Sequence, residues 1–178
     1  EMKSTGEVMG IDADFGRAYM KAEMGASHRL PKKGTVFLSV KDSDKRDAVQ
    51  IAKRLAALGF TIVATGGTAK VLERQGISVR RVFKIKDGSR PNAIDLIINR
   101  EIDLVMNSPS GKGAKTDEGR IRALAISHGI HVITSIAGAQ AAVNGIESLV
   151  RKPLEVRAIQ DYHPNYGSPR AAKHEALV

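Results

Sequence analysis

Five short apolar runs, each followed by an amphipathic pattern, constrain the fold of this chain more than any other feature. The runs are rich in Val, Ile and Leu, and their lengths are typical of buried strands. They cover residues 35–40, 60–64, 79–85, 103–106 and 130–133. Because strands that alternate with helices form parallel sheets, we predict a three-layer α/β/α fold with a five-stranded parallel sheet.

The segments between the runs carry recognisable helix start and stop signals. Apolar residues at helical spacing lie between an acidic cap at 42–44 and Gly59, and the next helix ends at Gly76. Further helices are predicted over residues 14–25, 93–99, 117–128 and 137–143. Residues 148–162 are expected to hold one short element, and residues 163–178 to form a loose tail.

Composition excludes several classes of protein. The chain of 178 residues has no cysteine, which excludes disulfides and thiolate metal sites. No apolar run reaches the roughly 18 residues that a membrane span requires. No signal peptide is apparent at the start. We therefore expect a cytoplasmic protein that makes no membrane contact.

The net charge of +9 is spread along the chain, with few aromatic residues. A nucleic-acid module would gather basic residues on one helix or pair them with aromatic stacking platforms, so binding to nucleic acid is not expected. The charge suits a small phosphorylated ligand better, although a solvated basic surface explains most of these residues equally well.

The segment from Phe60 to Gln75 passes from an apolar run through Thr65, Gly66, Gly67 and Thr68 into a helical pattern. We predict a strand, a tight turn at the two glycines and a helix. The first amides of a helix lack intrahelical partners and the helix dipole adds positive potential, so the turn suits a phosphate or carboxylate. The spacing matches neither a Walker loop nor the dinucleotide fingerprint. An ordinary Gly-rich loop, with Thr68 only capping the helix, remains open.

Polar side chains follow all five predicted strands, where ligands of open α/β sheets bind. They are Ser39 with Lys45, Thr65 to Thr68, Lys84, Asn107 with Ser108, and Thr134 with Ser135. This ring of donors suits an anion. Lys45 falls in the first turn of its helix, where the dipole disfavours a cation unless a phosphate lies nearby. A tolerated surface lysine is the alternative. Further basic residues could extend the site: Arg90, Lys112, Lys115, Arg120 and Arg122. Of these, Arg120 and Arg122 are expected to be solvated charges instead.

No catalytic set is predicted. Asp42 and Asp44 are better explained as helix caps than as general bases. His128 and His131 are expected to be structural, and no histidine pair has the HxxxH spacing of a metal site, so we predict no metal.

Three motifs resemble the methylglyoxal-synthase-like domain family. They are SVKDSDK at 39–45, ATGGTAKVL at 64–72 and NSPSGK at 107–112. The opening STGEVMGID at 4–12 resembles the end of the second ATP-grasp half of the carbamoyl phosphate synthase large subunit. The resemblance covers residues 2–162. It implies that residues 1–30 end a preceding ATP-grasp domain and its connector, that 31–162 form a methylglyoxal-synthase-like allosteric domain, and that 163–178 are the tail.

The resemblance also implies a function. The parent would be a ligase that uses ATP with Mg or Mn to make carbamoyl phosphate from bicarbonate and glutamine-derived ammonia, for pyrimidine and arginine biosynthesis. This part would be non-catalytic, would hold no cofactor, and would bind a UMP- or IMP-like effector or phosphate. Its partners would be the rest of the large subunit and the small glutaminase subunit, with a homo-oligomer left open. The implied effector positions are Ser39, Lys45, Thr65, Gly66, Gly67, Thr68, Lys84, Asn107 and Ser108.

Two departures from the family pattern narrow this expectation. Ornithine-activated relatives carry Tyr-Asp-Thr where this chain has Val132, Ile133 and Thr134, so an ornithine response is not expected. Methylglyoxal synthases carry a GGDQQ-like loop with the catalytic Asp, whereas residues 86–92 here read KDGSRPN. A free-standing phosphate lyase of that type is therefore the second hypothesis rather than the first.

Overall fold

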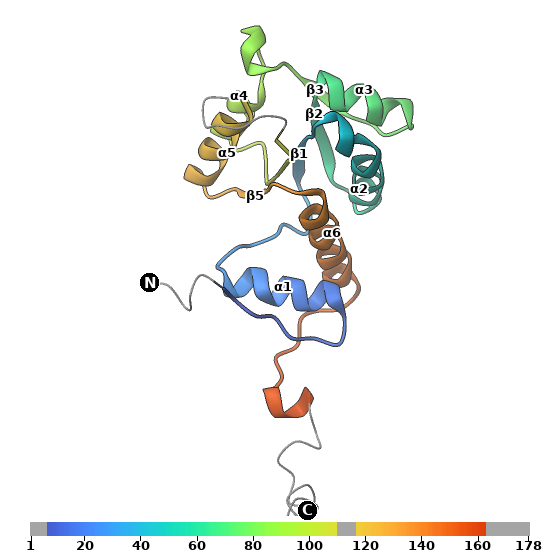
Figure 1. Ribbon diagram of the computed structural model, residues 1–178, viewed down its shortest axis with the longest axis vertical. Coiled ribbons are helices and arrows are strands. Elements are labelled where there is room, and N and C mark those ends of the chain that lie inside the picture. Colours follow the sequence, from blue (N-terminus) through green and yellow to red (C-terminus); the bar gives the residue numbers. More distant parts are fainter. Residues whose placement is uncertain (1–6, 110–116, 163–178) are drawn as a thin grey trace, which may run out of the picture.

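The five strands form one parallel sheet in the order β3-β2-β1-β4-β5 (Figure 1). The structure, a computed structural model, describes residues 7–109 and 117–162 of the chain. The strands are β1 (Thr35–Ser39), β2 (Thr61–Thr65), β3 (Arg80–Val82), β4 (Leu104–Asn107) and β5 (His131–Ile133). The predicted five-stranded parallel sheet is confirmed, and its two edge strands are the shortest.

Alternate residues of the strands face two separate cores, one on each side of the sheet. Val36 and Leu38 of β1 belong to one core, whereas Phe37 between them belongs to the other. The first core is completed by α2 (Lys45–Ala57), α3 (Gly66–Arg74) and α6 (Ile136–Arg151), and the second by α4 (Ala93–Ile98) and α5 (Asp117–Ser127). Burial of each large apolar side chain contributes roughly 1.5–3 kcal/mol. The three-layer α/β/α arrangement is confirmed (Figure 1).

The strand order reverses at β1, which pairs with β2 on one side and β4 on the other. Ligands of open α/β sheets bind beyond the carboxyl ends of the strands at such a reversal. Ser39 ends β1 and is aligned with Asn107, which ends β4. The topology therefore brings these residues together, with Thr65 at the end of β2 beside them.

Three predicted boundaries are wrong. α3 begins at Gly66 directly after β2, with Thr65 as the N-cap residue, so no tight turn separates strand from helix and neither glycine has a positive φ. α6 runs to Arg151 rather than Val143, because Ile146 and Leu149 continue its apolar face. The third predicted strand is reduced to β3, and residues 85–87 form a 3-10 turn instead.

The N-terminal helix α1 (Phe15–Gly25), predicted from its apolar spacing, crosses α6 (Figure 1). The two helices approach closely at glycines: a Cβ atom on Gly16 would lie 2.5 Å from the Asn144 carbonyl oxygen. One on Gly145 would lie 2.7 Å from the buried Met20 side chain. The assignment of residues 1–30 to a preceding domain stays a prediction, and the predicted tail at 163–178 lies outside the described residues.

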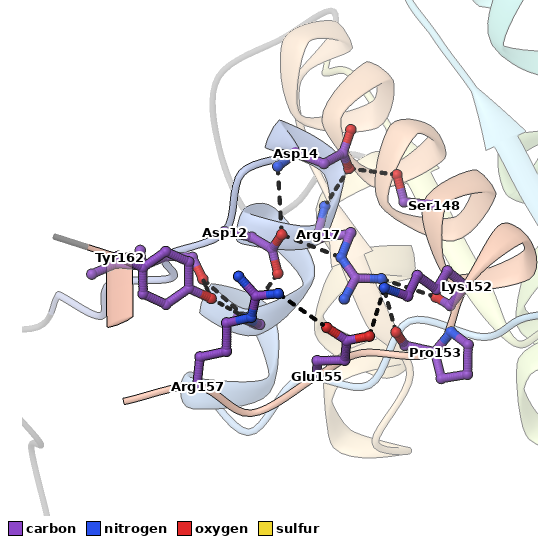
Figure 2. A network of polar contacts seen from close by, with 11 residues as sticks. Asp12, Asp14, Arg17, Ser148, Lys152, Pro153, Glu155, Arg157 and Tyr162 are labelled. Atoms are coloured by element: carbon purple, nitrogen blue, oxygen red, sulfur yellow. Dashed lines mark hydrogen bonds and ion pairs between the residues drawn. The ribbon is translucent and has the colours of Figure 1, made fainter. Parts of the chain in front are cut away.

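A polar network joins α1 to the chain that follows α6 (Figure 2). The Arg17 guanidinium donates to the carbonyl oxygens of Lys152 and Pro153 at 3.2 and 2.8 Å, and to Asp12 at 3.3 Å. The Ser148 hydroxyl donates to Asp14, the N-cap residue of α1, at 2.7 Å. Within the described ranges, every helix is too short or too polar to cross a lipid bilayer.

Candidate functional site

Two adjoining hollows lie at the carboxyl ends of β1 and β2 and in the segment after β3. Their volumes are about 380 and 390 Å³. Four residues line both hollows, which therefore form one cleft, here called the rim cleft: Ser39, Thr65, Lys84 and Glu118. The first hollow is otherwise lined by Val40, Lys41, Asp42, Lys45, Gly67 and Thr68, and the second by Phe83, Ile85, Lys86, Ala93, Asp117 and Ile121.

Lys45 directs its ammonium group toward the start of α3. It is the first residue of α2, and a Cβ atom on Gly67 would lie 3.4 Å from its Nζ atom. The distance places the ammonium group beside the first turn of α3. Lys45 Nζ lies 2.6 Å from Asp42 Oδ1, and the Lys45 hydrogen bond lowers the pKa of Asp42. The Asp42 side chain is 95% exposed, so this ion pair is open to exchange with a competing anion.

The first turn of α3 faces the same hollow. Gly66, Gly67 and Thr68 are its first three residues, whose amide groups have no partner within the helix. The Thr65 side chain makes no capping hydrogen bond to these amides. Backbone amides at the positive end of a helix dipole, beside an ammonium group, form an environment that stabilises an anion.

The hydroxyl groups of the cleft also hold its walls together. The Thr68 hydroxyl oxygen accepts from the Val40 amide at 3.3 Å, which ties the start of α3 to the end of β1. Thr68 is the third residue of α3 and not its cap, so the alternative in which Thr68 only caps the helix is wrong. Its hydroxyl proton can still be donated. The hydroxyl groups of Ser39 and Thr65 lie 3.4 Å apart at the ends of neighbouring strands.

Asn107 and Ser108 are buried behind the cleft wall and brace it. The Asn107 amide donates to the Ser39 carbonyl oxygen at 3.0 Å, and Arg122 donates to the Asn107 amide oxygen at 3.0 Å. The Ser108 hydroxyl accepts from the Lys41 amide at 3.2 Å, and its hydrogen bond to Asp44 lowers the pKa of that carboxyl. Direct contact of Asn107 or Ser108 with a ligand stays a prediction.

Arg122 is the residue behind the cleft whose position the sequence interpretation missed. It was expected to be a solvated charge, but it is partly buried and bonded to Asn107. The helical spacing could have indicated this, since Arg122 lies three residues from both Gly119 and Ala125, two of the three buried residues of α5. That spacing turns Arg122 toward the sheet.

Several other residues of the predicted ring lie apart from the rim cleft. Among the described residues that line it, none comes from β5, so the predicted convergence of Thr134 and Ser135 is wrong. Ser135 instead caps α6 by accepting from the Gly138 amide at 3.1 Å. Arg90 pairs with Asp95 at 3.0 Å. Lys112 and Lys115 lie outside the described residues.

Comparison with known proteins agrees with this architecture. A family model described as the MGS-like domain matches residues 47–134. The chain contains an MGS-like domain. This domain's fold is shared with the crystal structure of methylglyoxal synthase from Elizabethkingia anophelis, with a TM-score of 0.52, 21% identity, and coverage of 79% of this chain and 95% of that one.

Beyond the residues of the family model, the similarity to carbamoyl phosphate synthase large chains extends over most of the chain. It is 50% identical over 166 residues to the carbamoyl phosphate synthase large chain of Nostoc, covering 93% of this chain and 15% of that relative. It is 48% identical to the C-terminal section of the large chain of Methanopyrus kandleri, covering all of this chain and 33% of the relative. The resemblance to the synthase large subunit is confirmed, and the chain spans only a small part of these relatives.

Proposed function

We propose that this MGS-like domain is the regulatory domain of a carbamoyl phosphate synthase large subunit and binds an anionic nucleotide effector in the rim cleft. The observation that carries the proposal is the position of the Lys45 ammonium group over the first turn of α3. An ammonium group, helix-terminal amides and the Thr68 hydroxyl together provide the donors that a phosphate group needs.

The two hollows differ in a way that suits a nucleoside monophosphate. The first carries Lys41, Lys45 and Lys84 with the start of α3, which supports placing the phosphate there. The second adds apolar surface for a base: Phe83, Ile85, Ala93 and Ile121. Both volumes lie within the range of roughly 300–1,000 Å³ that small-molecule sites occupy. A UMP- or IMP-like ligand would extend from the first hollow into the second, with the ribose near Lys84.

The chemistry of the cleft supports binding rather than reaction. Asp42 is held ionised by Lys45, and its lowered pKa makes it a poor general base at neutral pH. Asp44 is likewise engaged by Ser108. The second hypothesis, a methylglyoxal-synthase-type phosphate lyase, draws its support from the shared fold, which by itself does not determine activity.

The names of the relatives support a proposal for the role of the whole protein. We propose that the parent makes carbamoyl phosphate from bicarbonate and glutamine-derived ammonia in the cytoplasm, for pyrimidine and arginine biosynthesis. ATP with Mg or Mn would act in other parts of the large subunit, and the ammonia would come from a small glutaminase subunit. The effector domain would act on these parts through a difference in its affinity for two states of the enzyme.

The experiment is titration calorimetry of the 178-residue chain with UMP, IMP and inorganic phosphate. Lys45→Gln removes the ammonium group, and Lys53→Gln, an exposed position on the same helix, is the matched control. We expect UMP or IMP to bind, Lys45→Gln to weaken binding by about 1–3 kcal/mol, and Lys53→Gln to leave it unchanged. Absence of heat with all three ligands, or equal affinity in both variants, would refute an anion site at Lys45. Release of phosphate from dihydroxyacetone phosphate would favour the lyase.

A further inference from the structure

Three potential metal ligands meet where the end of α1 reaches the sheet. Glu23 lies in α1, His28 follows that helix, and His131 begins the edge strand β5. Their ligand atoms all lie within 4.8 Å of one another. Glu23 Oε2 is 3.0 Å from His28 Nδ1 and 3.4 Å from His131 Nε2. Glu23 and His28 are five residues apart, whereas His131 is more than a hundred residues further along the chain. The rim-cleft function does not involve these three residues.

The end of α1 fixes the position of two of these ligands. The His28 amide donates to the Glu23 carbonyl oxygen at 2.8 Å, and the Ser27 amide donates to that of Met24 at 3.0 Å. This pair of bonds is the Schellman motif, in which the residue after the cap is left-handed. Here that residue is Ser27, with φ 64°, rather than the usual glycine. The motif returns the chain over the last turn, so His28 lies directly above Glu23.

His131, the third potential ligand, is more buried than His28. The side chains of His131 and Glu23 are 13% and 14% exposed, whereas that of His28 is 50% exposed and gives access from solvent. The two imidazole rings lie 4.4 Å apart between centroids. Tyr19, one turn before Glu23, forms a side-chain hydrogen bond with the Glu23 carboxylate. An outer hydrogen bond of this kind orients a ligating carboxylate.

We propose that Glu23, His28 and His131 bind a divalent transition-metal ion, best suited to Zn²⁺, with water in a fourth position. Two imidazoles and one carboxylate are a ligand set of tetrahedral zinc, whereas Mg²⁺ and Ca²⁺ prefer oxygen ligands. Zinc bonds to such atoms are about 2.0–2.2 Å long, so tetrahedral ligands lie roughly 3.3–3.5 Å apart. The separations of 3.0 and 3.4 Å from the Glu23 oxygen to the two imidazole nitrogens are close to this spacing. The bound ion would fasten the end of α1 to the edge of the sheet.

The test is equilibrium dialysis of the 178-residue chain against ZnCl₂ after removal of metal with a chelator. The variants are His28→Gln, His131→Gln and the double variant, with His128→Gln as the matched control. His128 follows α5, and its ring contacts Ser127 and the Leu124 carbonyl oxygen rather than the cluster. Circular dichroism without metal establishes that each variant is folded. His28→Gln changes an exposed side chain and keeps the test valid if His131→Gln unfolds.

We expect the wild type and His128→Gln to bind one Zn²⁺ per chain, and each cluster variant to bind at least about tenfold more weakly. Co²⁺ should give the intense visible absorption of tetrahedral coordination in the wild type and lose it in His28→Gln. Zinc should also raise the melting temperature of the wild type but not of the folded cluster variants. Equal zinc uptake by the wild type and the double variant would place the metal elsewhere and overturn the proposal. No uptake by the wild type would show that the cluster is only an ion pair shared by two imidazoles.

Discussion

Two regions are rich in polar side chains but use them differently: the rim cleft and the α1–α6 junction, which is formed by residues 12–14, α1, α6 and residues 152–162. In the junction, Asp12 accepts from Lys21 at 2.8 Å and Arg17 at 3.3 Å, and the Lys21 hydrogen bond is the main reason that its pKa falls to about 2. Arg17 is 9% exposed and donates to two backbone carbonyls as well. In the cleft, Lys45 is paired with a carboxylate that is almost fully exposed.

The difference separates a polar network that holds structure from one that can exchange partners. A buried arginine that donates to its own chain has little capacity for a ligand, and removal of one of its partners leaves a buried donor without that hydrogen bond. An ammonium group paired with an exposed carboxylate loses little when an anion replaces that partner. We therefore expect the exposure of the charged partners, rather than the density of charge, to distinguish a ligand site from a structural network in this molecule.

Substitution of Gly16 in the junction is expected to cause the largest loss of stability. A Cβ atom there would lie 2.5 Å from the Asn144 carbonyl oxygen and 2.6 Å from the Ser148 hydroxyl, so Gly16→Val must push α1 away from α6. We expect a loss of about 3 kcal/mol or more in the free energy of unfolding, measured by urea titration. Gly25→Ala is the control, because its Cβ would make ordinary contact with Val8 at 3.7 Å. A Gly16→Val protein as stable as the wild type would show that the two helices are not packed as described.

A substitution of Asn107 tests whether the cleft wall, like the junction, depends on hydrogen bonds between buried groups of the chain itself. Asn107→Ala removes the bond to the Ser39 carbonyl and leaves Arg122 without its amide partner. We expect a loss of about 2 kcal/mol in unfolding free energy, with weaker binding of phosphate because Ser39 is no longer held. Urea titration and calorimetry measure the two effects. Asn99→Ala, an exposed position at the end of α4, should change neither.

Acid should weaken the junction through Asp12. Its pKa is about 2 in the folded chain, below the ordinary value of 3.8, so its ionised form stabilises the fold. That contribution is complete above about pH 4 and is lost as the pH falls toward 2. Urea midpoints measured at both ends of this range should fall more in the wild type than in Asp12→Asn. Equal falls would mean that Asp12 contributes no pH dependence, and Asp87→Asn in an exposed turn serves as the control.

The sequence predicted the layers and the position of the cleft because both follow from periodicity. Short continuous apolar runs specify strands that are buried on both faces, and parallel topology then places Ser39, Thr65 and Asn107 at one edge. The start of α3 was predicted less well. Glycines usually indicate a turn, but here Gly66 and Gly67 begin the helix itself. The position of the Lys45 ammonium group beside Gly67 is a contact between residues in different helices.

Contacts between segments far apart in the sequence could not be predicted from the spacing of apolar residues either. Nothing in the spacing of Arg17 indicates that the carbonyls of Lys152 and Pro153 will lie beside it, since that depends on how α1 crosses α6. The same holds for the cluster of Glu23, His28 and His131, which the search for an HxxxH motif could not detect. Short motifs detect ligands that share a helix and miss those assembled from separate elements.

Substitution of Lys45 is expected to change stability least, in contrast to substitutions in the junction. Lys45→Gln removes an exposed ion pair and also a cation from the first turn of α2, where the helix dipole disfavours it. The two effects oppose each other, so we expect the unfolding free energy without ligand to change by less than about 0.5 kcal/mol. In saturating nucleotide the wild type should gain more stability than the variant, since the ligand binds the variant more weakly. Urea titration with and without UMP measures both quantities. A large loss of stability without ligand would place Lys45 among the structural charges, and the distinction between the two regions would then fail.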